Sequence, residues 1–144
     1  MNSKKAFTLL EVLLTVSILV LSAGVMSPIY FSAKNKEDLS SSVDMVVASL
    51  RRAQALSIGG QHDTSWGVKV LNGNIIVFSG NDFLSRNSAF DEKILTNKNI
   101  IISGNNEFVF DKITGSTSDF GSVILSLRLN SNTISVNKRG IVSH

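Results

Sequence analysis

The chain has 144 residues, a formal net charge of +3 and no cysteine. This length has room for one globular domain together with a membrane segment. The lack of cysteine excludes disulfide cross-links and zinc sites built from thiolates, so the domain must be held together by packing.

An apolar run extends from Phe7 to Phe31, directly after Lys4 and Lys5, and its one charged residue is Glu11. About 20 apolar residues suffice to span a bilayer, and lysines before such a run favour a cytoplasmic N-terminus. A carboxylate inside the bilayer costs roughly 3 kcal/mol, so it marks function and needs a partner. We therefore expect residues 7–31 to form a transmembrane helix, which the resemblance described next makes the assembly helix as well.

The stretch Lys4-Lys5-Ala6-Phe7-Thr8-Leu9-Leu10-Glu11 resembles the signal of type IV prepilins and type II secretion pseudopilins. The resemblance implies a leader peptide of residues 1–6, cleavage by a prepilin peptidase between Ala6 and Phe7, and N-methylation of Phe7. Ala6 departs from the family, which usually has glycine before the cleaved bond. Without the two leader lysines, the fourteen basic residues fall to twelve against eleven acids, so the mature chain is nearly neutral.

The same resemblance makes Glu11, the fifth residue of the mature chain, an assembly residue. Its carboxylate would meet the protonated N-terminal amine of a neighbouring subunit. Pro28 falls where many pilins carry a helix-kinking proline. The implied partners are other pilin or pseudopilin subunits, the prepilin peptidase and the inner-membrane assembly platform. The implied location is the cytoplasmic (inner) membrane, with a single pass and the globular domain outside.

Two simpler interpretations of the N-terminus stay open. One is an ordinary secretory signal peptide with Val12–Val25 as its apolar region, and the other is a plain single-span anchor. Neither explains an acidic residue at position 11.

The helix is expected to continue to about Ile58 and to become amphipathic, because apolar residues recur at helical spacing. Gly59 and Gly60 supply a left-handed cap that ends it. The stripe expected to pack on a sheet consists of Leu39, Val43, Val46, Val47, Leu50 and possibly Gln54.

After Gly60 the pattern predicts strands. Trp66–Leu71 and Ile75–Phe78 flank Asn72-Gly73-Asn74, a strong hairpin signal, whereas the polar segment Gly80–Lys93 is predicted to be a loop. Ile100–Ser103 and Glu107–Phe110 are expected to pair with each other. Ser122–Leu129 is a predicted strand whose apolar residues, Val123, Leu125, Leu127 and Leu129, all fall on one face. Asn130-Ser131-Asn132 is the expected turn after it. Ile134 and Val136 then lie in the returning strand, and a short last strand is expected at Ile141-Val142. A long helix packed on an antiparallel β-sheet is an α+β fold, with residues 32–144 as the exported domain.

This second part resembles the FimT/GspH-type minor pilins, through short motifs in a matching order. They are Arg51, Arg52, Gln54 and Ala55, then Trp66-Gly67-Val68, Phe108 and Phe110, Gly115, and Arg139-Gly140-Ile141. The resemblance implies a minor pilin or pseudopilin, a structural subunit of a type IV pilus or type II secretion pseudopilus.

No enzyme, cofactor or metal site is predicted. His62-Asp63-Thr64-Ser65 places the residue types of a catalytic triad side by side, but triad members meet through folding. His62 and His144 are expected to be solvated. The acidic residues Asp82, Asp91, Glu92, Asp111 and Asp119 lack the spacing of a calcium loop.

DNA is the alternative partner, because FimT-like minor pilins can bind DNA through C-terminal basic residues during uptake. Lys138 and Arg139 are the candidate DNA contacts, with Lys98, Lys112 and Arg128 as further bases. Acidic residues interleave with these bases, and aromatic stacking platforms are few. The structural role is therefore the first hypothesis and DNA uptake the second, while an anchored hydrolase has hardly any support.

Overall fold

The computed structural model describes residues 7–144, and of residues 23–29 only the backbone. A long helix, α1 (Leu9–Ile58), is followed by one 3-10 turn, η1 (Gln61–Asp63), and then by strands alone. The strands are β1 (Trp66–Leu71), β2 (Asn74–Ser79), β3 (Asn87–Leu95), β4 (Ile101–Gly104), β5 (Glu107–Phe110), β6 (Gly121–Leu127), β7 (Asn130–Val136) and β8 (Val142–Ser143). The chain divides into two compact units, Met1–Lys34 and Asn35–His144.

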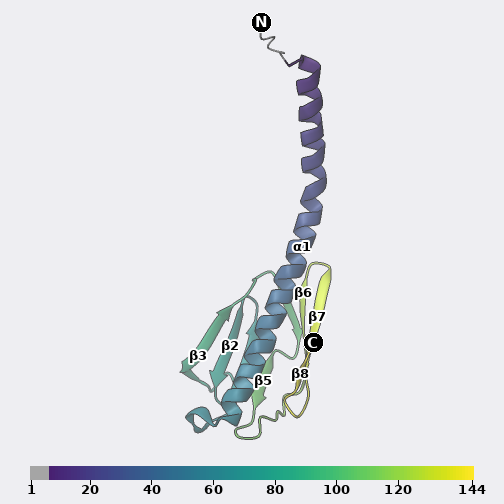
Figure 1. Cartoon of the computed structure of the whole chain (residues 1–144). Coiled ribbons are helices and arrows are strands. Elements are labelled where there is room, and N and C mark those ends of the chain that lie inside the picture. The colour runs from purple at the N-terminus through teal and green to yellow at the C-terminus, as the bar shows by residue number, and fades with distance from the viewer. Residues whose placement is uncertain (1–6) are drawn as a thin grey trace. The chain divides into compact units, whose positions relative to one another are not determined.

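The strands form two four-stranded antiparallel sheets, ordered β3-β2-β1-β5 and β4-β6-β7-β8. Figure 1 shows the second half of α1 lying across both sheets. The predicted α+β class is confirmed, although two sheets take the place of the expected single one. Among the described residues, no helix combines the length and hydropathy needed to cross a membrane.

The core lies between α1 and the inner faces of the two sheets. The predicted helix stripe is buried there, together with Ala53, while Gln54 at its end is only half-buried. The inward side chains of the strands complete the core: Trp66, Val68, Val70, Ile75, Val77, Phe108, Phe110, Val123, Leu125, Leu127, Ile134 and Val136. A second cluster (Ile76, Phe78 and Val109) lies on the other face of the first sheet, where Phe83 packs against it.

The expected pairing of β4 with β5 is wrong. β4 pairs with β6 and β5 pairs with β1, so the chain changes sheet at Asn105-Asn106. Gly104 makes this change possible, because its φ is +82° and a β-carbon there would collide with the carbonyl oxygen of Ser122. Backbone hydrogen bonds continue on both sides of the change, from Asn105 N to Ser122 O (2.9 Å) and from Val70 N to Asn106 O (2.8 Å). The β4–β5 segment therefore joins the two sheets.

Two further predictions are corrected. The segment predicted as the loop Gly80–Lys93 contains most of β3, because an edge strand tolerates charged side chains that a central strand would not. Leu129 does not share the inward face of β6, since the turn comes at Arg128-Leu129 and leaves Leu129 fully exposed. The hairpin at Asn72-Gly73-Asn74 is confirmed, with Leu71 opposite Asn74.

Ser57 joins the end of α1 to both neighbouring strands of the first sheet. Its buried hydroxyl donates to the carbonyl oxygen of Phe110 (2.9 Å) and accepts the N–H of Trp66 (2.8 Å). Its own carbonyl oxygen accepts the N–H of Ile113 (2.9 Å). One side chain thus bonds to backbone groups of two buried residues, one on β1 and one on β5.

Replacing Ser57→Ala leaves the Trp66 N–H and the Phe110 carbonyl without that partner. Since a buried unsatisfied group costs about 1–3 kcal/mol, we expect the free energy of unfolding to fall by about 2–3 kcal/mol. The single tryptophan, Trp66, is buried, so its fluorescence during urea unfolding of the detergent-solubilised chain reports on this domain.

Ser49→Ala is the matched control. Ser49 is equally buried, but its hydroxyl bonds only to the Met45 carbonyl of its own helix (2.7 Å). It should change stability little, and equal losses for the two variants would contradict the role of Ser57.

Candidate functional site

Thr8 caps the start of α1, and Glu11 lies in the first turn. The Thr8 carbonyl oxygen accepts the N–H groups of Glu11 (3.1 Å) and Val12 (3.2 Å), and its hydroxyl oxygen accepts the Glu11 N–H as well (3.3 Å). This is the first half of a capping box, whose Thr-x-x-Glu pattern is readable in the sequence. Thr8 was not among the predicted residues, although this pattern indicates a helix cap. The carboxylate of Glu11 also lies where the helix dipole favours negative charge.

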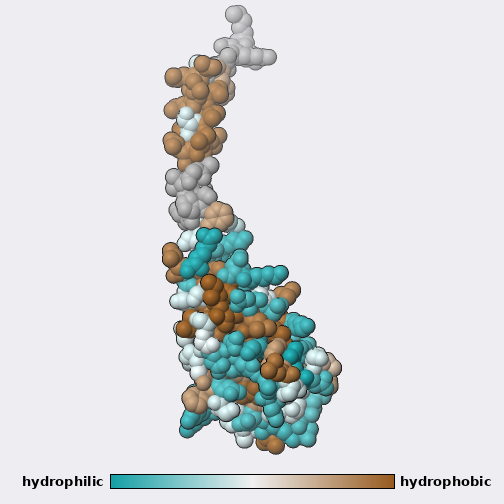
Figure 2. Space-filling view, turned by 180° about the vertical axis from the view of Figure 1, so that it is seen from behind, coloured by the Kyte–Doolittle hydropathy of each residue, from teal (hydrophilic) through white to brown (hydrophobic). Residues whose placement is uncertain are grey.

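The first part of α1 presents apolar side chains in every direction. Each large apolar residue from Phe7 to Leu21 is exposed, with exposed fractions between 48% and 81%. On the face that Figure 2 shows, this segment is mainly hydrophobic in colour, whereas the domain mixes hydrophobic areas into a larger hydrophilic surface. A helix that is apolar all round is suited to a lipid or helix-packed environment.

The polar side chains within this segment bond to their own helix. The hydroxyls of Thr15, Ser17 and Ser22 donate to the carbonyl oxygens of Val12 (2.9 Å), Leu13 (2.7 Å) and Ile18 (2.8 Å). These three hydroxyls therefore need no water and remain bonded when the segment enters an apolar environment.

The residues predicted to act in processing and assembly lie at or near this helix start. Phe7 is 75% exposed and precedes the helix by two residues, and Glu11 is exposed on its first turn. Ala6 lies outside the described residues. The backbone is helical at Pro28, whose side chain is not described, and the kink there remains a prediction.

Residues 1–27 match the family model of the prokaryotic N-terminal methylation motif. The chain carries the prepilin signal of type IV pilins and pseudopilins. A search of curated proteins and a search of solved structures each found no match. The signal implies assembly with other pilin subunits and processing by a prepilin peptidase, while the FimT/GspH subfamily stays a prediction.

The candidate basic residues do not form one cluster. Lys138 lies over the half-exposed ring of Phe120, with its Nζ atom 4.8 Å from the ring centroid, and Arg139 is exposed beside it. Lys112 is ion-paired with Asp63. Arg128 lies at the opposite end of β7, a strand of seven residues and so about 23 Å long. Lys138 and Arg139 are thus left as a pair.

The side chain of Gln54, on α1, holds the turn that carries Lys138 and Arg139. The Gln54 amide donates to the carbonyl oxygens of Gly115 (3.0 Å) and Arg139 (3.4 Å). Gly140 has φ +77°, and a β-carbon there would collide with Gly115 and Gln54. The end of α1 therefore holds the loop between β5 and β6, which contains Phe120, and the turn between β7 and β8.

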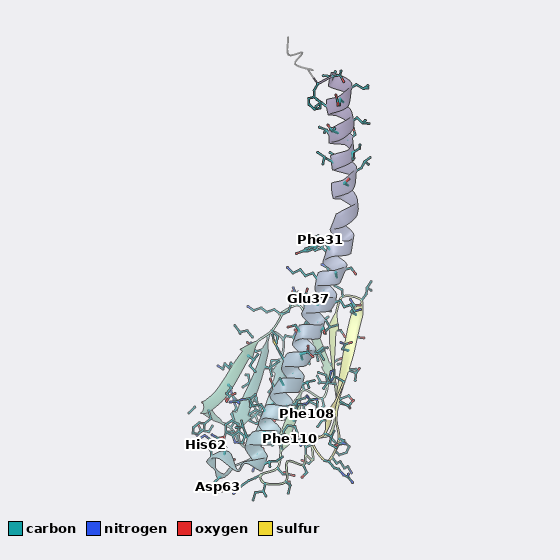
Figure 3. The ribbon with its side chains drawn as sticks, in the orientation of Figure 1. Phe31, Glu37, His62, Asp63, Phe108 and Phe110 are labelled. Carbon is teal, nitrogen blue, oxygen red and sulfur yellow. The ribbon has the colours of Figure 1, made fainter. Side chains whose placement is uncertain are left out.

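The histidine loop forms no catalytic arrangement. Figure 3 shows His62 and Asp63 on the loop after α1, where both have φ near +57°. The His62 ring stacks on Phe90 with 4.1 Å between centroids, while the carboxylate of Asp63 pairs with Lys112, which lowers the pKa of Asp63. The two side chains are thus engaged with different partners. Within residues 7–144 as described, no group of three acidic or histidine side chains could hold a metal ion.

Arg52 and Glu92 form the best-aligned ion pair, from α1 to the edge strand β3. Two hydrogen bonds of 2.6 Å join the guanidinium to the two carboxylate oxygens. The hydrogen bond from Arg52 lowers the pKa of Glu92 below its ordinary value, and the same contact raises the pKa of Arg52. Both side chains are substantially exposed (54% and 40%), so solvent screens most of the attraction.

The pKa of Glu92 is lower in the folded state than in the unfolded chain. The Arg52–Glu92 pair therefore stabilises the folded state fully above the ordinary glutamate pKa of about 4.3. This contribution is lost as the pH falls through the lowered pKa of Glu92. We expect Glu92→Gln to lose about 0.5 kcal/mol at pH 7 and to match the unmutated chain once that carboxylate is protonated. Urea unfolding followed by Trp66 fluorescence at a series of pH values measures this. Glu37→Gln, at an exposed glutamate of α1, is the control, and a Glu92→Gln deficit that grows toward acid pH would contradict the assignment.

Proposed function

We propose that the chain is a minor pilin or pseudopilin, a structural subunit of a type IV pilus or type II secretion pseudopilus. Residues 7–31 hold it in the cytoplasmic membrane before assembly, and residues 32–144 form the domain outside. The observation that carries the proposal is the methylation motif, which leads directly into a helix start with exposed apolar residues in all directions. Phe7 and Glu11 both lie at that start.

Processing prepares this end of the helix. A prepilin peptidase cuts between Ala6 and Phe7, and the new amine of Phe7 is methylated. A secondary amine stays protonated at neutral pH, so each subunit presents a cation one helical turn from its own Glu11. Thr8 accepts the N–H groups of Glu11 and Val12 in this first turn. The Glu11 side chain is exposed, so its carboxylate is available to a neighbour.

Assembly brings the Glu11 carboxylate to the N-terminal amine of the adjacent subunit. Burial between helices strengthens the attraction and makes the loss of one partner costly, at about 3–5 kcal/mol. The pair therefore favours one axial displacement between subunits. The apolar side chains around it supply the non-directional part of the contact.

The test is Glu11→Val, with Ser17→Val as the matched control in the same apolar segment. Val is more apolar than Glu, so insertion is retained, and the intact mass should still show a chain that begins at a methylated Phe7. The amount of subunit in sheared filaments, relative to that in membranes, should fall several-fold for Glu11→Val alone.

Two results would count against this function. A mature chain that begins near Val25 would mean that signal peptidase had cut it, and the pilin assignment would fail. Equal incorporation of Glu11→Val and the unmutated chain would remove Glu11 from the assembly mechanism, although the chain would remain a pilin-like subunit.

A DNA-binding minor pilin that acts in DNA uptake is the second candidate. The observation in its favour is the exposed Lys138–Phe120 stack beside Arg139, which combines a cation, an aromatic ring and a second base. Its weakness is charge, since eleven acids nearly balance the basic residues of the mature chain.

Under the structural role, Lys138→Ala/Arg139→Ala should leave stability within about 0.5 kcal/mol, because both side chains are exposed. DNA binding should be too weak to measure with or without the substitutions. The measurement is a mobility shift at several salt concentrations. Micromolar, salt-dependent binding that the double substitution abolishes would put DNA capture first.

A further inference from the structure

The sheet β4-β6-β7-β8 has one edge that is only partly occupied. β8 has two residues and pairs with β7 at Ser135 and Val136 only. The earlier part of β7, residues 130–134, has β6 on one side and, within the described residues 7–144, no strand on the other. Figure 1 shows β7 at the border of the domain. We call residues 130–134 the free edge.

The backbone of the free edge offers N–H and C=O groups that no strand uses. In an antiparallel sheet, the groups of successive residues point alternately to the two sides of a strand. The N–H of Asn137 points away from β6, because it donates to the carbonyl oxygen of Ile141 on the β8 side (3.1 Å). By alternation, the backbone groups of Ser131 and Thr133 also point away from β6, to the side where no strand lies. The residues between them bond to β6.

The free edge is exposed and carries no charge. Its first four residues are asparagine, serine, asparagine and threonine, and all four are exposed. Proteins usually protect an exposed edge with charged side chains, as the edge strand β3 does with Asp91, Glu92 and Lys93. The opposite edge strand of the same sheet, β4, has only four residues and ends at Gly104, whose φ of +82° is not extended. Of the two edges of this sheet, the free edge is the better suited to accept a strand.

We propose that the free edge binds an extended segment of another protein as an added strand, antiparallel to β7 and in line with β8. Backbone donors and acceptors at strand spacing are matched by another extended polypeptide, whose main chain supplies the affinity. The two residues of the segment that lie opposite Thr133 and Ser131 exchange four hydrogen bonds with them. The inference goes beyond the proposed function, because this contact does not involve the apolar segment of α1 or the methylation motif.

The side chains around the free edge indicate the composition of the segment. Thr133 and Ser131 lie on the outer face of the sheet, since Ile134 next to them is buried on the inner face. Hydroxyl side chains directly opposite them can form cross-strand hydrogen bonds. A strand antiparallel to β7 ends beside the β6–β7 turn, where Arg128 is exposed. We therefore expect an extended segment with threonine or serine at alternate positions and an acidic residue at its C-terminal end.

The probe is a fluorophore-labelled synthetic peptide, Thr-Val-Thr-Val-Ser-Glu. Its fluorescence anisotropy should rise when the full-length chain is added in detergent. N-methylation of its first and third residues removes the N–H groups that face β7, so the affinity should fall about tenfold. N-methylation of its second and fourth residues, whose N–H groups face away from β7, should leave the affinity unchanged.

The matching change in the chain is Thr133→Pro. It removes one N–H of the free edge and leaves the hydrogen bonds to β6 in place, and proline is tolerated at such a position of an edge strand. The affinity for the unmethylated peptide should fall about tenfold. Thr133→Val keeps the N–H and is the control, which should bind as the unmutated chain does. Urea unfolding followed by Trp66 fluorescence checks that both variants are folded.

Each outcome supports or overturns the inference. No binding of the peptide by the unmutated chain would overturn it, and so would equal affinities of the two N-methylated peptides. Equal binding by Thr133→Pro and Thr133→Val would do the same. Dimers of the chain that form without peptide and are lost in Thr133→Pro would mean that a second copy occupies the edge, which would overturn the choice of partner. If Thr133→Pro does not fold, the two N-methylated peptides decide alone.

Discussion

The fold depends on how the end of α1 is tied to the sheets, and the hydroxyl of Ser57 makes that tie. It bonds to β1 and to the end of β5, which come from different parts of the sequence. Gln54, one turn earlier, fixes the two loops beyond β5 and β7. The apolar stripe of α1 supplies most of the burial, but these polar contacts set where along the sheets the helix stops.

One helix thus serves three surroundings in turn. Its first part is apolar on all sides, its later part buries one stripe against the sheets, and the opposite stripe stays exposed. The sequence of α1 changes accordingly, from apolar residues at every position to apolar residues at helical spacing. Because the Arg52–Glu92 and Lys112–Asp63 ion pairs are substantially exposed, they adjust local geometry more than total stability.

The sequence predicted what periodicity and local signals encode. These include the helix and its buried stripe from Leu39 to Leu50, the hairpin at Gly73, and the methylation motif later matched at residues 1–27. The predictions from the sequence failed where the structure of a segment depends on which strand it pairs with. Gly104-Asn105-Asn106 suits a hairpin turn and a change of sheet equally well, and the charges of Asp91 and Glu92 conceal an edge strand. Ser57 carries no pattern at all, because a buried serine acquires its role only from the strands that reach it.

The shared β4–β5 segment has a consequence for how the domain comes apart. β4 belongs to one sheet and β5 to the other, with only Asn105 and Asn106 between them, and both sheets share one core beneath α1, so opening of one sheet disturbs the other. The two halves of the domain therefore unfold as one cooperative unit. A domain without disulfides gains from such coupling, because a sheet that opened alone would expose unpaired strand edges to other chains.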